Sequence, residues 1–102
     1  MNETRTKAWI MYALAMASEN GAVSFASISQ VADGINHAVP TQKEMQESLS
    51  WLVANNMVLK LGSKYQLTEE GAELITLIRV HNNTISSVWI SLTESLTGLN
   101  HS

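Results

Sequence analysis

Residues 57–71, which read MVLKLGSKYQLTEEG, decide the fold. On both sides of Gly62 and Ser63, apolar residues recur at every second position, which is the period of a β-strand. Glycine followed by serine suits a two-residue hairpin turn of the type that needs glycine first. Thr68 can then cap a helix whose first turn holds Glu69 and Glu70, where the helix dipole favours negative charge. The stretch therefore predicts a β-hairpin followed directly by a helix.

Two further helices are predicted before the hairpin by their start signals. Ser27–Gln30 and Thr41–Glu44 both have the form of a capping box, in which two side chains satisfy free backbone N–H groups. The first of these helices is expected to end near Gly34 and the second near Asn55. The short segment between them ends in Pro40, so the two helices should meet at an angle. Such a corner is the helix-turn-helix arrangement.

Residues 4–18 are predicted to form a first helix that is apolar on two sides. One face has the spacing of a core helix, and Trp9, Tyr12 and Met16 form a second stripe beside it. A covering for that stripe could come from a C-terminal helix of the same chain or from a second copy. The sequence leaves these two alternatives open.

From Leu74 onward, apolar residues step by three or four positions around His81, which predicts a C-terminal dimerisation helix over residues 69–97. We expect it to be continuous or kinked once, although the poor helix formers of residues 82–84 could split it. The predicted dimer interface combines the first helix with this seam: Trp9, Tyr12, Met16, Ile78, His81, Ile85, Val88, Trp89 and Leu92.

Three stretches resemble the winged-helix regulators of the MarR/PadR type: residues 28–33 (ISQVAD), 49–58 (LSWLVANNMV) and 65–71 (YQLTEEG). The resemblance implies one domain over residues 1–102, mainly α with a small β-hairpin. Residues 4–68 would form the winged helix-turn-helix and 69–97 the dimerisation helix. It also implies that the third helix enters the major groove of DNA while the hairpin lies along the backbone or minor groove. The implied DNA contacts are Thr41, Gln42, Lys43, Gln46, Ser50, Lys60 and Lys64.

The net charge of the chain bears on whether its partner is DNA or another protein. The chain has 102 residues, of which 45% are hydrophobic, and carries nine acidic and six basic residues for a net charge of −3. Because proteins that bind nucleic acid usually present a basic surface, Glu44, Glu47 and Trp51 on the third helix keep a second interpretation open. In that interpretation the domain binds another protein and never DNA.

Catalysis is not expected from this sequence. Cysteine is absent, so there is no thiol nucleophile and no thiolate metal site. The histidines lie far apart along the chain and have no second ligand at helical spacing. We therefore expect no enzymatic activity, metal or cofactor. The absence of cysteine, of a convincing secretion signal and of a membrane-spanning apolar run favours a cytoplasmic location.

Overall fold

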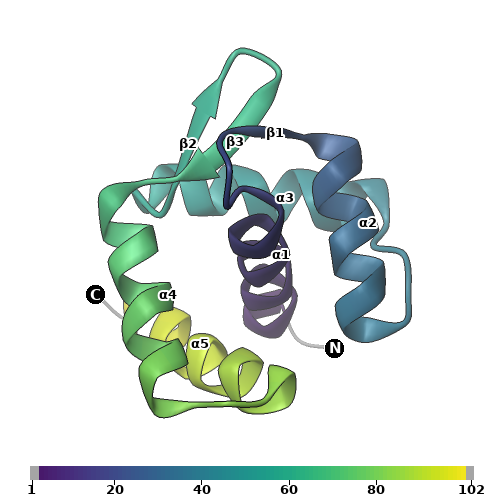
Figure 1. Cartoon of the computed structure of the whole chain (residues 1–102). Coiled ribbons are helices and arrows are strands. Elements are labelled where there is room, and N and C mark those ends of the chain that lie inside the picture. Colours follow the sequence, from purple (N-terminus) through teal and green to yellow (C-terminus); the bar gives the residue numbers. More distant parts are fainter. Residues whose placement is uncertain (1–2, 101–102) are drawn as a thin grey trace.

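The computed structural model describes residues 3–100. They form five helices and a small three-stranded antiparallel sheet (Figure 1). The elements in chain order are α1 (Glu3–Ala17), β1 (Val23–Ser24), α2 (Phe25–Asn36), α3 (Gln42–Ala54), β2 (Val58–Leu61), β3 (Lys64–Leu67), α4 (Glu69–His81) and α5 (Ile85–Asn100). The expectation of a mainly helical chain with a small hairpin is confirmed. None of the helices in the described part of the chain is both long and apolar enough to span a membrane.

Helix α1 lies at the centre of the fold, surrounded by the other helices in Figure 1. All residues from Ala8 to Ala15 are buried, so the helix is covered on every side over two turns. Helices α2 and α3 pack on it, and α5 packs along it as well. The chain's own C-terminal segment therefore covers Trp9 and Tyr12, as one of the two alternatives predicted, whereas Met16 is exposed.

Two tryptophans connect α1 to its neighbours. The Trp9 indole N–H donates to the carbonyl oxygen of Ala32 in α2 at 2.8 Å. The Trp89 indole N–H donates to the carbonyl oxygen of Arg5 at 2.9 Å, and the Arg5 guanidinium lies 4.7 Å from the centre of the Trp89 ring. The two tryptophan rings lie 6.2 Å apart. Each buried indole thus has a hydrogen-bond partner, which burial of a polar group requires.

The starts of α2 and α3 differ in how well the sequence predicted them. The capping box at α3 is confirmed: the Thr41 hydroxyl accepts from the Glu44 N–H at 3.0 Å, and the Glu44 carboxylate accepts from the Thr41 N–H at 2.8 Å. The box predicted at Ser27 is wrong, because the N-cap is Ser24 and its hydroxyl accepts from the Ser27 N–H. The reason is that Ser24 pairs with Lys64 in the sheet, and this pairing holds its backbone in the extended conformation that an N-cap needs.

The hairpin forms as the sequence predicts. Gly62 has a φ of 63°, while Ser63 keeps a negative φ, as expected for a turn that needs glycine first. Strand β1 adds to the free side of β3, so the sheet has one strand more than expected.

The junction between the hairpin and α4 is tight at Gly71. The Thr68 N–H donates to the carbonyl oxygen of Met57, and the Thr68 hydroxyl accepts from the Gly71 N–H, both at 3.0 Å. A β-carbon on Gly71 would collide with that same Met57 carbonyl oxygen and would lie 3.1 Å from its carbon. The glycine of the YQLTEEG stretch is thus required by a close approach of backbone to backbone.

The expectation of one continuous or kinked C-terminal helix is wrong. Helix α4 ends at His81, the backbone of Asn82 is extended, and α5 begins at Ile85. The polar residues of the break cap both ends: the Asn82 amide donates to the Ile78 carbonyl at 2.9 Å, and the Thr84 hydroxyl accepts from the Ser87 N–H at 3.1 Å. The break lets α5 fold back, and it thereby buries Trp89 against α1. The alternative of a split at residues 82–84 is the one observed.

Candidate functional site

The outer face of α3 carries most of the residues that the sequence assigned to DNA. Gln42, Gln46 and Ser50 are exposed and follow one another at intervals of four, so they form one stripe along the helix. Thr41 and Lys43 are exposed at its start. This stripe is free of acidic side chains, and it offers amide and hydroxyl groups to a partner.

The charged residues at the start of α3 are partly occupied by contacts within the helix. The Glu44 carboxylate accepts from the backbone of Thr41, as described above. The Lys43 ammonium lies 3.9 Å from the Glu47 carboxylate, and both side chains are exposed. Exposed pairs of this kind contribute little to stability. Lys43 therefore brings a positive charge to this surface that Glu47 partly neutralises.

A groove separates α3 from the hairpin. It has a volume of about 620 Å³ and is lined by Phe25, Gln46, Leu49, Ser50, Val53, Ala54, Lys60 and Tyr65. Its floor is apolar, because Leu49 is buried while Phe25 and Tyr65 are half-buried. The Lys60 ammonium lies 6.0 Å from the centre of the Tyr65 ring. The groove therefore brings together three of the predicted DNA contacts, Gln46, Ser50 and Lys60, around an apolar centre.

The two lysines of the hairpin do not share a face. Lys60 pairs with Tyr65 across the strands, whereas Lys64 pairs with Leu61. Side chains alternate between faces along a strand, and cross-strand partners share a face. Lys60 therefore lines the groove, while Lys64 lies on the opposite face beside the exposed Leu61. The register of the hairpin therefore separates Lys64 from the groove that Lys60 lines.

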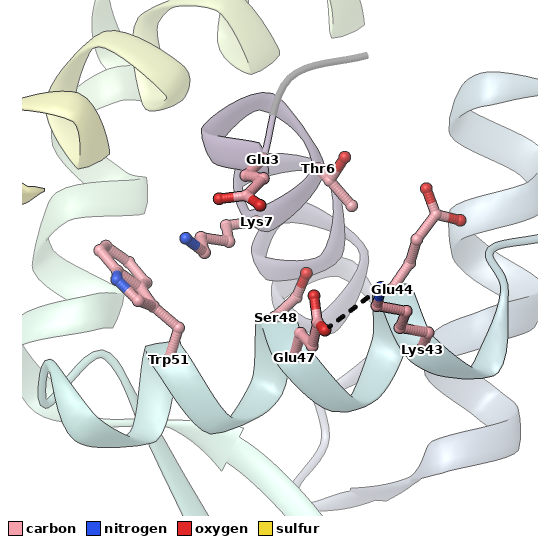
Figure 2. A pocket seen from close by; sticks show the side chains of 8 residues that line it. All are labelled: Glu3, Thr6, Lys7, Lys43, Glu44, Glu47, Ser48 and Trp51. Carbon is pink, nitrogen blue, oxygen red and sulfur yellow. Dashed lines mark ion pairs between the residues drawn. The ribbon is translucent and has the colours of Figure 1, made fainter.

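A second cavity, of about 340 Å³, lies between the start of α1 and the other side of α3 (Figure 2). The Lys7 ammonium lies 4.8 Å from the centre of the Trp51 ring, a cation–π distance. The lining includes both carboxylates and ammonium groups, and its residues are Glu3, Thr6, Lys7, Lys43, Glu44, Glu47, Ser48 and Trp51. Sequence reasoning missed this cavity because no local pattern links Lys7 to a tryptophan on another helix.

The predicted dimer residues fall into two groups. Those buried within the monomer are Trp9, Tyr12, Ile78, Val88, Trp89 and Leu92. Those exposed are Met16, His81 and Ile85. The fold-back of α5 explains the division, since it turns the apolar side of the C-terminal segment toward α1.

Within residues 3–100, no three histidine or acidic side chains gather in a way that could hold a metal ion. No family model, curated protein or solved structure matches this chain. The interpretation of the site therefore rests on its own geometry.

Proposed function

We propose that this chain is a winged helix-turn-helix protein that binds double-stranded DNA as a homodimer and regulates transcription. The observation that carries the proposal is the exposed stripe of Gln42, Gln46 and Ser50 on α3, with Lys60 of the hairpin across the groove. In this interpretation α2 and α3 form the helix-turn-helix, and β2 and β3 form the wing. The major groove of B-DNA is wide enough to admit a helix with such a stripe.

The side chains of the stripe suit base edges better than phosphates. A glutamine amide can donate to and accept from adenine at once, through N6 and N7, whereas guanine is usually read by arginine or lysine. Gln42 and Gln46 are the exposed glutamines of α3, and α3 has no arginine. We therefore expect Gln46 to favour A·T pairs at the position that it reads.

Phosphate contacts are few, which sets the expected strength of binding. Lys43, Lys60 and Lys64 are the candidate cations of each protomer, and one of them is partly neutralised by Glu47. With at most three neutralised phosphates per protomer, the slope of log K against log salt for a dimer is no steeper than about −5.4. Binding should therefore be weak on random DNA and should depend on base contacts.

A fluorescence anisotropy titration on random duplex DNA, at about 50 and about 150 mM salt, tests the proposal. We expect affinity to fall with salt, and Lys60→Ala to make the slope shallower by about one unit for each phosphate that is no longer neutralised. Arg79→Ala, which removes an exposed cation from α4, is the matched control and should leave the slope unchanged. If the folded protein fails to bind even at the lower salt concentration, the proposal is wrong.

The apolar floor of the groove favours a second candidate, a winged-helix module that binds another protein. Phe25, Leu49 and Tyr65 give the groove more apolar surface than a phosphate backbone can use, and Val53 at its edge is 39% exposed. An amphipathic segment of a partner could bury its apolar side chains there. Failure to bind DNA by a folded protein, with the groove intact, would leave this candidate as the better one.

A further inference from the structure

The outward face of α4 is the most exposed apolar surface on the described helices. Val80 and Leu77 have exposed fractions of 72% and 58%, the highest values of any large apolar side chain in these helices. The opposite face of α4, with Gly71, Ile75 and Ile78, is buried in the core. Exposed leucine and valine on neighbouring turns of one helix indicate a contact surface rather than a scattered apolar residue.

The residues around Leu77 follow a regular spacing. Glu70, Leu74, Leu77 and His81 step by four, three and four positions, which places them on one stripe of α4. Leu74 is half-buried, at the border of the core, and the other three are exposed. The stripe thus has two leucines at its centre, a carboxylate at one end and an imidazole at the other.

We infer that a second copy of the chain packs on this stripe, with the two α4 helices antiparallel. A two-fold axis between Leu74 and Leu77 places Leu74 of one copy opposite Leu77 of the other. The same axis places Glu70 opposite His81 at both ends of the pair. A two-fold contact needs only one self-complementary patch, and this stripe supplies one.

The charges of α4 favour a second copy over another partner. Its first half exposes Glu69, Glu70 and Glu73, and its second half has no acidic residue. His81 lies on the stripe, whereas Arg79 lies on another side of the helix and lines a cavity with Tyr12 and Val88. An antiparallel pair brings each acidic half against the half of the other copy that holds His81, and it also sets the two helix dipoles in opposite directions. A parallel pair would instead place carboxylates against carboxylates. The positions of the charged residues therefore favour a second copy of the chain as the partner, with its α4 helix antiparallel to the first.

The size of the stripe sets the strength of the dimer. A helix of 13 residues is about 20 Å long, so one helix pair buries less than the roughly 1,200 Å² of a standard stable interface. We therefore expect a reversible dimer that dissociates on dilution. This inference deepens the proposed homodimer by naming its surface, and it does not require that DNA be bound.

Sedimentation velocity on the full chain, between about 10 µM and about 1 mM, tests the inference. We expect the wild type to shift from monomer to dimer over this range, and Leu77→Glu to raise the dissociation constant by about 100-fold or more. Ile90→Glu is the control, because Ile90 is 49% exposed and belongs to α5, not to the stripe on α4. It should dimerise as the wild type does, and circular dichroism should show that both variants are folded.

A charge exchange tests the direction of packing. Glu70→Lys and His81→Glu should each weaken the homodimer, and an equimolar mixture of the two variants should associate more tightly than either alone. A wild type that stays monomeric at the highest concentration, a dimer that Leu77→Glu leaves intact, or a mixture without gain would each overturn the inference. A protein that stays monomeric but binds DNA would refute the α4 dimer contact and would leave the proposed DNA binding intact. A protein that dimerises through α4 but does not bind DNA would support the contact and refute the proposed DNA binding.

Discussion

Gly71→Ala provides the sharpest test of the packing between the hairpin and α4. Alanine at a helical position normally stabilises a protein relative to glycine, by up to about 1 kcal/mol. At Gly71 the added β-carbon would instead collide with the carbonyl oxygen of Met57 and lie 3.1 and 3.4 Å from the carbonyl and α-carbons. These are backbone atoms, and a backbone cannot turn aside as the end of a flexible side chain can.

The expected loss of stability follows from two costs and one opposing gain. Inserting a methyl group into a packed site costs about 1–3 kcal/mol. To relieve the collision, the backbone at Met57 must move, and this movement strains the hydrogen bond from the Thr68 N–H to the Met57 carbonyl oxygen. Loss of that hydrogen bond would cost about 1 kcal/mol more. After subtraction of the helix preference of alanine, we expect a net loss of about 2 kcal/mol. For a domain of this size that corresponds to a fall of about 10 °C in Tm.

Urea unfolding followed by circular dichroism measures this loss as a lower midpoint at constant m-value. Gly34→Ala is the matched control, because Gly34 is also helical and an added β-carbon there would meet no atom within 4 Å. That variant should be as stable as the wild type or up to about 1 kcal/mol more stable. If Gly71→Ala proved as stable as Gly34→Ala, the close approach to Met57 would be refuted.

Two further stability predictions follow from the hydrogen bonds of the core and the caps. Trp9→Phe removes the hydrogen-bond donor to Ala32 and leaves a cavity, so it should lower the free energy of unfolding by about 2–3 kcal/mol. Trp51→Phe, at a half-exposed site, should cost less than about 1 kcal/mol. Thermal melts compare the two variants, and equal losses would contradict the buried, hydrogen-bonded position of Trp9. Ser24→Ala should cost about 1 kcal/mol and Ser27→Ala only a few tenths, because Ser24 is the N-cap of α2; urea midpoints in the opposite order would show that the helix begins later.

The elements that sequence predicted well are those whose signals are local. The capping box at Thr41 involves residues three positions apart, and the hairpin turn at Gly62 involves adjacent ones. Such contacts form in the same way whatever the rest of the chain does. Exposure of the α3 stripe was predictable for a similar reason, since helical spacing alone places Gln46 on another side of the helix from the buried Ser48 and Leu52.

The elements that sequence predicted poorly depend on distant partners. Ser24 is the N-cap of α2 because Lys64, forty positions along the chain, pairs with it. The break at Asn82 forms because burial of Trp89 against α1 is worth more than a continuous helix, and the seam of apolar residues was equally compatible with a second copy. For the site, the opposite faces of Lys60 and Lys64 follow from strand register, which the sequence does not fix by itself.

The contact between α1 and α5 has a consequence for biosynthesis. Trp89 and Arg5 are 84 residues apart in sequence, yet the indole of one donates to the carbonyl of the other. Helix α1 leaves the ribosome before the other described helices and is the last of them to be fully covered, since α5 emerges after the rest. Until then the apolar residues 8–17 of α1 must be covered by α2 and α3 or by a chaperone. A chain that stops within α4 would expose α1 permanently, so we expect it to be degraded or to aggregate.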